Sequence, residues 1–413
     1  MRITSLILAA ALCIMSLTAC GKDTKKQPVN DTPQTEASEK GDESMKEEII
    51  EVSALTNTYC KLTQDKELTI AYIGGSVTDG YGSSNPSSKS WSAHLGRWIT
   101  ENYPDVEFQN VKCSIGGTGS YLSSFRYERE IAPVNPDLLF IEFAINDYYN
   151  GVSYEQVIRS SESIVRIANR HNPGIDIIYV LTFDTGTKDS DYNQLKAHRD
   201  VAKYYGYPCI KLSDKVYSLL EKTGEDLSVY LKDNVHPNDK GYEYYAEQII
   251  ALVEGELEKA AKAELAEYKE HVLPEDTLSP TLTLNANMLY ADEIDLSNST
   301  GWEYQPDTKY SCLGMRYNGR IFAEGIGSKL TFEFEGTDIG LATGIGPNMG
   351  IVSVTVDDRE PVLLNEYRMY ENPWDRIVAQ DLPYGKHTVT IEIIGKDEAS
   401  NGYSYEIGAI LIN

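Results

Sequence analysis

Positive charge, cysteine and long apolar segments are all scarce in this sequence. Its 413 residues carry 37 Lys and Arg against 63 Asp and Glu, which gives a formal net charge of −26. This balance argues against a nucleic-acid-binding protein, because few cations are available to neutralise a phosphate backbone. It also argues against attachment to a membrane through a polybasic surface. Six cysteines are too few for a fold that depends on disulfide bonds.

Signatures of metal and nucleotide binding are missing as well. Neither the histidines nor the cysteines show a metal-ligand spacing, and no CxxC pair occurs. The GxGxxG and GxxxxGKS/T patterns of nucleotide-binding loops are absent too. These absences disfavour a metal centre and a nucleotide-binding site. With 41% hydrophobic residues, most of the chain can nevertheless bury a core.

The N-terminal residues have the features of a targeting segment. Arg2 precedes a short apolar run over residues 3–17, and the run ends in Leu17-Thr18-Ala19-Cys20. This arrangement resembles a bacterial lipoprotein signal, in which cleavage leaves Cys20 as the lipid-bearing residue. An ordinary secretory signal is the alternative. We expect a signal peptide over residues 1–19 and an extracytoplasmic protein that is anchored to the cell membrane through lipid on Cys20.

Three further regions follow the predicted signal. Residues 20–49 lack aromatic side chains and contain few large aliphatic ones, which predicts a disordered tether. Residues 50–272 contain most of the helical periodicity. Residues 280–413 consist of β segments punctuated by glycine. No later run of about 18 apolar residues occurs, so we expect no transmembrane helix.

Short β segments alternate with amphipathic helices over residues 50–272. Strands are predicted at 68–73, 106–113, 138–143, 175–182 and 209–212. Helices are predicted at 91–102, 154–171, 192–205 and from 239 to as far as 271, the last part being a solvated helix or spacer. This alternation indicates a three-layer α/β fold with a parallel sheet covered on both faces. Ligands of such sheets bind at the carboxyl ends of the strands.

Residues 280–413 show turn signals between β segments and little helical periodicity. Strands are predicted at 329–334, 351–356, 388–394 and 407–412. Regularly spaced short strands of this kind are typical of a β-sandwich. We therefore predict a second, all-β domain after the α/β domain.

Four segments carry residues that could do chemistry. Ser76 follows Gly74 and Gly75 at the end of the first strand, where the glycines permit a sharp turn. A glycine-rich segment, residues 114–120, follows the second strand and allows backbone N–H groups to approach a ligand. Asn146 follows the third strand and has a side-chain amide that can donate to an oxyanion. Each segment also has a plain structural reading as a helix cap or a tight turn.

The fourth segment places a carboxylate three residues before an imidazole. Asp233 can fold back onto Nδ1 of His236, which would leave Nε2 free to accept a serine proton. An isolated Asp-x-x-His is more often a surface turn. The combination of all four segments in this order carries much more information than any one of them.

The chain order Ser, Gly, Asn, Asp-x-x-His resembles the SGNH (GDSL-like) hydrolase family over residues 66–252. The resemblance implies a flavodoxin-like sheet and a serine-esterase mechanism without metal or cofactor. It implies that Ser76 is the nucleophile and that His236 and Asp233 complete the triad. The oxyanion would be bound by the Ser76 N–H and by Gly117 and Asn146, with Gly116 as a second possible register for the glycine.

Two positions depart from the family pattern. Gly75 stands where the common form has an aspartate before the serine, and Ala144 stands where the family often has glycine. Neither change removes a reacting atom. Both weaken any transfer of substrate preference from better-known members.

The predicted substrate is a small acyl ester, foremost an O-acetyl group, on a polysaccharide. The surface anchor favours a glycan, and the C-terminal segment is similar to the jelly-roll modules that accompany SGNH carbohydrate esterases. Tyr148 and Tyr149 directly follow the Asn-Asp pair and could stack on a sugar. Two alternatives stay open: a lipase, thioesterase or general esterase with the same chemistry, and an inactive glycan-binding lipoprotein.

Overall fold

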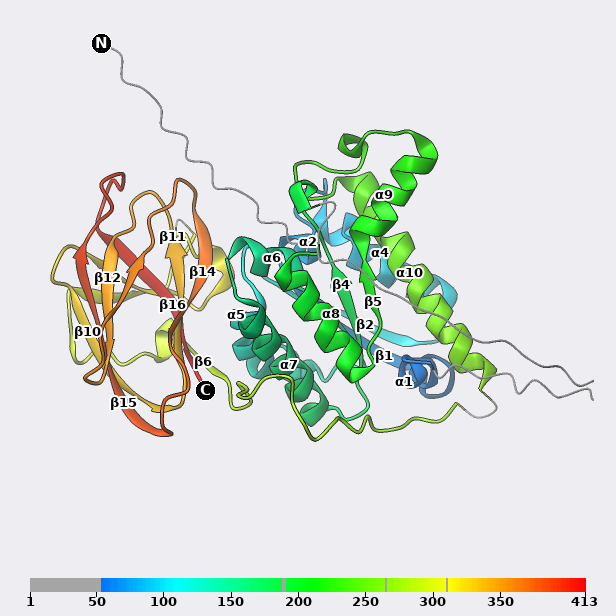
Figure 1. Ribbon diagram of the computed structural model, residues 1–413, viewed down its shortest axis with the longest axis horizontal. Coiled ribbons are helices and arrows are strands. Elements are labelled where there is room, and N and C mark those ends of the chain that lie inside the picture. The colour runs from blue at the N-terminus through cyan, green and yellow to red at the C-terminus, as the bar shows by residue number, and fades with distance from the viewer. Residues whose placement is uncertain (1–52, 188–190, 264–265, 310) are drawn as a thin grey trace, which may run out of the picture. The chain divides into compact units, whose positions relative to one another are not determined.

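The structure is a computed structural model that describes residues 53–187, 191–263, 266–309 and 311–413 (Figure 1). The predicted signal peptide, the predicted tether and Cys20 lie outside these ranges. All the described residues belong to one compact unit. Within the ranges given, no helix has the length and apolar character needed to cross a bilayer.

A five-stranded parallel sheet forms the centre of the first half. Its strand order is β2-β1-β3-β4-β5, the flavodoxin-like order, which confirms the predicted fold class. The two strands β3 and β4 are buried along their whole length, as expected for the centre of a sheet covered on both faces. The strands are β1 (Glu67–Gly74), β2 (Glu107–Ser114), β3 (Leu138–Glu142), β4 (Asp176–Leu181) and β5 (Cys209–Lys211).

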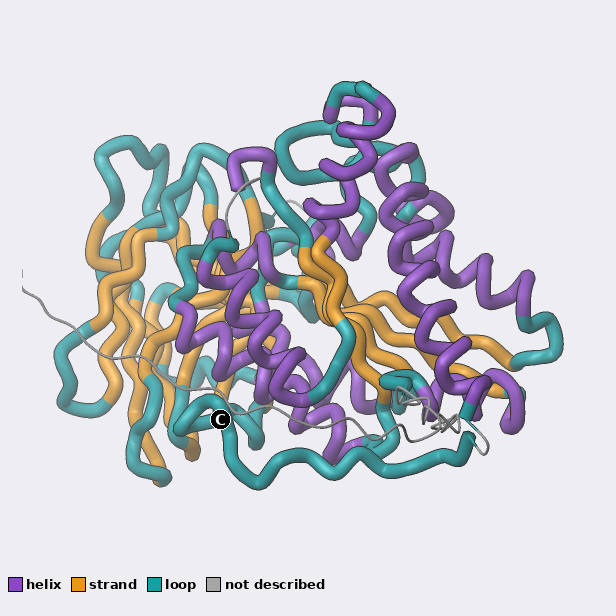
Figure 2. The backbone as a smooth tube through the Cα atoms, turned by 45° about the vertical axis from the view of Figure 1, so that its right-hand side comes forward, coloured by secondary structure: helices purple, strands orange, loops and turns teal. Residues whose placement is uncertain are grey.

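Helices cover both faces of this sheet, as Figure 2 shows. One face packs against α5, α7 and α8, and the other packs against α1, α4, α9 and α10. The helices are α1 (Thr56–Cys60), α2 (Ser76–Asp79), α3 (Pro86–Lys89), α4 (Trp91–Asn102), α5 (Ser120–Arg126), α6 (Ala144–Tyr149), α7 (Tyr154–His171), α8 (Asn193–Tyr205), α9 (Leu212–Thr223) and α10 (Asp239–Lys262).

Side-chain caps fix the starts of three of the longer helices. The residue before each helix accepts a backbone N–H from the first turn: Ser90 before α4, Ser153 before α7 and Asn238 before α10. Such caps satisfy a donor that the helix itself leaves unpaired. The predicted starts of all three helices are therefore confirmed.

The last helix is shorter than predicted. It ends at Lys262, and its final turns are packed rather than solvated, because Val253 and Leu257 are buried against the sheet. Beyond it, backbone groups find partners outside the helix: the Lys269 N–H donates to Asn57 Oδ1 and the His271 N–H donates to the Pro173 carbonyl. These bonds hold residues 266–273 in a non-helical path, so the expectation of a helix as far as 271 was wrong.

The second half is an all-β sandwich of two antiparallel sheets, as predicted. One sheet has the order β13-β12-β15-β10-β7 and the other the order β14-β11-β16-β9-β8, with β6 paired to β16. Inward side chains of both sheets form one core. The strands are β6 (Asn287–Tyr290), β7 (Ser299–Thr300), β8 (Trp302–Gln305), β9 (Arg320–Glu324), β10 (Lys329–Gly336), β11 (Ile339–Ile345), β12 (Ile351–Val356), β13 (Val362–Asn365), β14 (Asn372–Ala379), β15 (Gly385–Gly395) and β16 (Ser404–Ile412).

The sandwich shares a core with the α/β part. Ala342 on β11 and Ala409 and Leu411 on β16 belong to the same apolar cluster as α5 and α7. A buried ion pair crosses this contact, with the Arg159 guanidinium 2.7 Å from the Asp338 carboxylate. The contact brings the start of β14 close to the carboxyl ends of the parallel strands, where the candidate site lies.

Candidate active site

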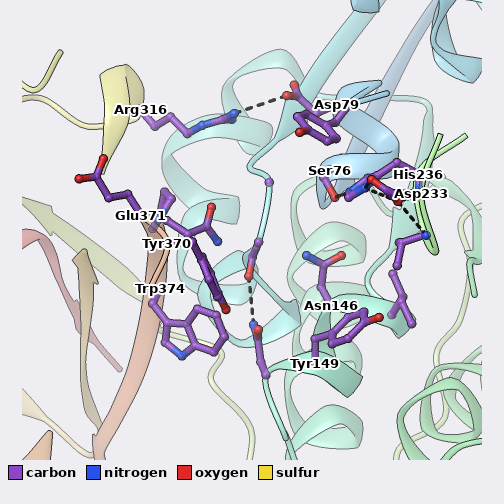
Figure 3. A pocket seen from close by; sticks show the side chains of 18 residues that line it. Ser76, Asp79, Asn146, Tyr149, Asp233, His236, Arg316, Tyr370, Glu371 and Trp374 are labelled. Atoms are coloured by element: carbon purple, nitrogen blue, oxygen red, sulfur yellow. Dashed lines mark hydrogen bonds and ion pairs between the residues drawn. The ribbon is translucent and has the colours of Figure 1, made fainter. Parts of the chain in front are cut away.

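Three side chains from distant parts of the sequence form a hydrogen-bonded chain. Ser76 Oγ lies 2.8 Å from His236 Nε2, and His236 Nδ1 lies 2.8 Å from Asp233 Oδ2 and 3.0 Å from Oδ1. Figure 3 shows the three residues at one end of a pocket. The arrangement has the geometry of an activated serine nucleophile with its base and orienting carboxylate.

The sheet topology explains why Ser76 lies there. Ser76 is the first residue of α2, directly after β1, and β1 lies next to β3 at the point where the strand order changes direction. In sheets of this class the crevice outside the carboxyl ends of the strands at that point is the usual ligand site.

The segment around His236 is held by its own hydrogen bonds. Asp233 Oδ1 accepts the backbone N–H groups of Val235 (2.9 Å) and His236 (2.8 Å). Burial acts to raise the pKa of Asp233, but these two bonds and the His236 ring outweigh it, so the pKa is lowered. An ionised carboxylate on Nδ1 keeps the proton there and leaves Nε2 as the acceptor for the serine hydroxyl.

Tyr81 packs on the outer side of the imidazole. The two ring centroids are 4.6 Å apart in an edge-to-face arrangement, and the Lys232 ammonium lies 5.1 Å from the Tyr81 centroid. The backbone N–H of Tyr81 donates to the Ser76 carbonyl (2.9 Å). Tyr81 therefore links the turn that carries the serine to the ring that faces it.

The predicted oxyanion donors lie in the same pocket. Asn146 is on α6 rather than in a loop, is 7% exposed and lines the pocket with Ser76. Gly116 and Gly117 line it as well, and Gly117 has a φ of +82°, a conformation that favours glycine. A side chain on Gly117 would also collide with Asn372, because an ideal Cβ would lie 1.8 Å from its Nδ2. Both glycines thus remain candidates for the backbone donor.

The pocket has a volume of 610 Å³, within the usual range for ligand sites. Of the two predicted sugar-binding tyrosines, Tyr149 lines it and Tyr148 does not. Tyr148 packs against Tyr192 instead, with ring centroids 4.9 Å apart. The Tyr149 hydroxyl donates to Asp184 (2.5 Å); burial and this bond raise its pKa well above the ordinary value. Tyr149 is therefore held as a neutral, oriented ring.

Among the described residues, no group of three or more His, Cys, Asp or Glu side chains could hold a metal ion. Cys60, Cys113, Cys209 and Cys312 are free thiols. Cys113 and Cys209 are only partly buried, because β2 and β5 are the edges of the sheet. Burial still raises the pKa of Cys113 to about 11, so it is a poor thiolate.

Comparison with known proteins agrees with this geometry. Residues 72–244 match the model of the GDSL-like Lipase/Acylhydrolase family. The segment is a GDSL-like SGNH hydrolase domain. The match places the chain among the carboxylic ester hydrolases. No curated protein matched the sequence.

Two solved structures share both halves of the fold. The structure of a two-domain esterase active on acetylated mannans, co-crystallised with mannopentaose, has a TM-score of 0.74 at 19% identity and covers 88% of this chain and 96% of that chain. A second structure of a two-domain esterase active on acetylated mannans has a TM-score of 0.71 at 20% identity with the same coverage. At such identities the likeness shows a common fold, in which a sandwich accompanies the GDSL-like domain.

The sandwich supplies one side of the pocket of the GDSL-like domain. Figure 3 shows Arg316, Tyr370, Glu371 and Trp374 opposite Ser76 and His236. Arg316 also contacts the GDSL-like domain, with a guanidinium nitrogen 3.4 Å from Asp79 Oδ2. None of these four residues was predicted from the sequence, because no local pattern reveals a contact between two domains. The available signal was the pair of aromatic residues Tyr370 and Trp374, four positions apart.

Proposed function

We propose that the chain is a serine esterase that removes small acyl groups, foremost O-acetyl, from a polysaccharide. The observation that carries this proposal is the hydrogen-bonded chain from Ser76 through His236 to Asp233. It supplies a nucleophile, a base and the carboxylate that orients the base, and it does so within a GDSL-like domain.

The first half of the reaction acylates the serine. His236 Nε2 takes the proton from Ser76 Oγ while Oγ bonds to the ester carbonyl carbon, which gives a tetrahedral oxyanion. In this proposal the Ser76 N–H, a glycine N–H of the 116–117 pair and the Asn146 amide donate to that oxygen. His236 then gives its proton to the departing sugar oxygen, and the acyl group stays on Ser76. Asp233 stabilises the imidazolium formed in between.

The second half releases the acid. A water molecule gives a proton to His236 and attacks the acyl carbon, and a second tetrahedral oxyanion forms at the same site. Its collapse breaks the bond to Ser76 Oγ, which recovers the proton from His236. The products are a carboxylic acid, acetate in the proposed case, and free enzyme.

The lining of the pocket supports a glycan as the alcohol part of the ester. Tyr81, Tyr149 and Trp374 present aromatic rings, and Tyr370 is 56% exposed at the rim. Aromatic rings with polar edges suit the alternating apolar and hydroxyl faces of sugars. The two similar structures are of esterases described as active on acetylated mannans. We extend this to an enzyme held at the outer side of a cell membrane by lipid on Cys20, as the sequence predicts.

Release of acetate from acetylated polysaccharides tests the proposal. The purified chain, without residues 1–19, is incubated with acetylated mannan, acetylated xylan and p-nitrophenyl esters of increasing acyl length. We expect acetate release from at least one polysaccharide and loss of turnover in Ser76→Ala and in His236→Ala. Faster hydrolysis of long-chain esters would instead indicate a lipase or thioesterase. Binding of polysaccharide without turnover of any ester would indicate an inactive glycan-binding protein.

A further inference from the structure

A buried carboxylate lies directly below the turn that carries Ser76. Glu142 is the last residue of β3, is fully buried and pairs across the parallel ladder with Gly74 of β1. The mechanism above makes no use of it. A buried carboxylate is costly unless it is hydrogen-bonded, so its partners indicate what it contributes.

Three of its partners belong to the serine turn. Glu142 Oε2 accepts the Gly75 N–H (3.3 Å), the Thr78 N–H (3.2 Å) and the Thr78 hydroxyl (2.8 Å). The other oxygen, Oε1, accepts the Thr182 hydroxyl just after β4 (2.6 Å). One side chain thus joins the carboxyl ends of three neighbouring strands below the pocket.

These bonds bracket the nucleophile. The first N–H groups of a helix have no acceptor within the helix, and α2 begins at Ser76. Glu142 takes the N–H groups of Gly75 and Thr78, which lie on either side of the serine. The Ser76 N–H lies between them and can donate into the pocket. The bonds of Gly75 and Thr78 to Glu142 fix its orientation.

We propose that Glu142 is a positioning residue that fixes the Gly75–Ser76 peptide, so that the Ser76 N–H can donate to the oxyanion while Oγ faces His236. The inference rests on the proposed function of Ser76. It also accounts for a departure from the family pattern. Position 75 has no room for a carboxylate while Asn146 keeps its present conformation, because Asn146 fills the space beside it. The carboxylate that holds the turn in this chain comes from the neighbouring strand.

Two substitutions, Glu142→Gln and Glu142→Leu, distinguish this positioning role from simple core packing. In Glu142→Gln the amide oxygen can still accept from Gly75 and Thr78, and the amide N–H₂ can donate to the Thr182 hydroxyl. In Glu142→Leu all of these side-chain bonds are lost at similar volume, and the Gly75 N–H keeps only the backbone carbonyl of residue 142 (3.3 Å). Asp176→Asn is the matched control: Asp176 is an equally buried carboxylate that accepts from Thr58 and lies at the opposite, amino end of β4.

The experiment measures kcat and KM on p-nitrophenyl acetate, together with the rate of serine labelling by a fluorophosphonate, in folded protein. We expect Glu142→Leu to lower kcat about 100-fold, as for loss of an oxyanion donor, with KM within about twofold. Glu142→Gln should stay within about fivefold of the wild-type kcat. Asp176→Asn should lower the thermal midpoint and leave kcat unchanged. Wild-type kcat in folded Glu142→Leu would overturn the inference.

A second pair of variants serves if Glu142→Leu does not fold. Thr78→Val removes one donor from the oxygen that faces the serine turn, and Thr182→Val removes the donor from the other oxygen. We expect Thr78→Val to lower kcat about tenfold and Thr182→Val to lower it less. Equal kcat in both variants would overturn the inference. If wild-type protein neither turns over esters nor reacts with the fluorophosphonate, the proposed function itself fails.

Discussion

The Asn146 side chain occupies the space that a side chain at position 75 would need. An ideal Cβ on Gly75 would lie 2.3 Å from Asn146 Oδ1 and 2.7 Å from Nδ2, closer than real atoms approach. The residue before the serine and the predicted oxyanion amide are therefore sterically coupled. Asn146 can adopt this conformation because position 75 is a glycine, although the family commonly has an aspartate there.

Gly75→Asp is expected to lower activity even though it restores the common family residue. The new side chain would displace the Asn146 amide from the pocket, and loss of one oxyanion donor costs about 10² to 10³ in kcat. Steady-state kinetics on p-nitrophenyl acetate test this. Gly255→Ala is the control, because nothing lies within 4 Å of a Cβ at that helical position. It should keep wild-type kcat, and a Gly75→Asp enzyme with equal kcat would disprove the coupling.

Asn146→Ala should leave a folded enzyme with reduced turnover. The amide is one of three predicted donors, so its removal should lower kcat about 10² to 10³-fold while the Ser76 and glycine N–H groups preserve residual catalysis. KM for a small ester should change little, because the donor acts on charge that develops in the transition state. The measurement is kcat on p-nitrophenyl acetate against a thermal-unfolding control. An unchanged kcat would remove Asn146 from the oxyanion site.

The local sequence pattern and the rules of sheet topology were sufficient to predict most of the α/β fold. Buried apolar runs predicted β1, β3 and β4, and amphipathic periodicity predicted the helices that became α4 and α7. The chemistry-bearing segments could be expected to converge, because parallel strands end at the same edge of a sheet. Local signals did not show that residues 266–273 leave the helical path, where the Lys269 N–H donates to Asn57 Oδ1 and the His271 N–H donates to the Pro173 carbonyl.

The details of the pocket depended on contacts that local sequence does not encode. Tyr148 and Tyr149 are adjacent on α6, and neighbouring helical residues point about 100° apart, so only one of them faces the pocket. Tyr370 and Trp374 reach the site only because β14 packs beside the α/β domain. Glu142 ends an apolar run, and its hydrogen bonds to a turn far back in the sequence were not predictable from that run.

Tyr370→Ala should impair the polysaccharide reaction selectively. The ring is 56% exposed at the sandwich side of the pocket, where an extended glycan would contact it and an isolated ester would not. We expect KM on acetylated polysaccharide to rise about fivefold to tenfold, in line with loss of one aromatic contact, while kcat/KM on p-nitrophenyl acetate stays constant. Tyr384→Ala, at an exposed tyrosine that does not line the pocket, is the control. Equal losses on both substrates would argue against a glycan contact.

The stability of the protein should depend on the titration of Glu142. Burial raises the pKa of this carboxyl from 4.5 to about 7, although hydrogen bonds from Thr182, Thr78 and Gly75 act in the opposite direction. Between pH 4.5 and about 7 the folded state therefore binds more protons than the unfolded state. Stability from this group is fully present below pH 4.5 and is lost as the pH rises to 7, by about 3 kcal/mol in total.

Glu142→Gln isolates this contribution because glutamine does not titrate, whereas every other ionisable group is common to both proteins and cancels in the comparison. Thermal midpoints of wild type and Glu142→Gln are measured at intervals from pH 4.5 to 8. We expect the wild type to lose stability relative to the variant as the pH rises, most steeply between pH 5 and 7, and the difference to become constant above that range. A difference that stays constant from pH 4.5 to 8 would show that Glu142 has an ordinary pKa, and that its hydrogen bonds offset the cost of burial.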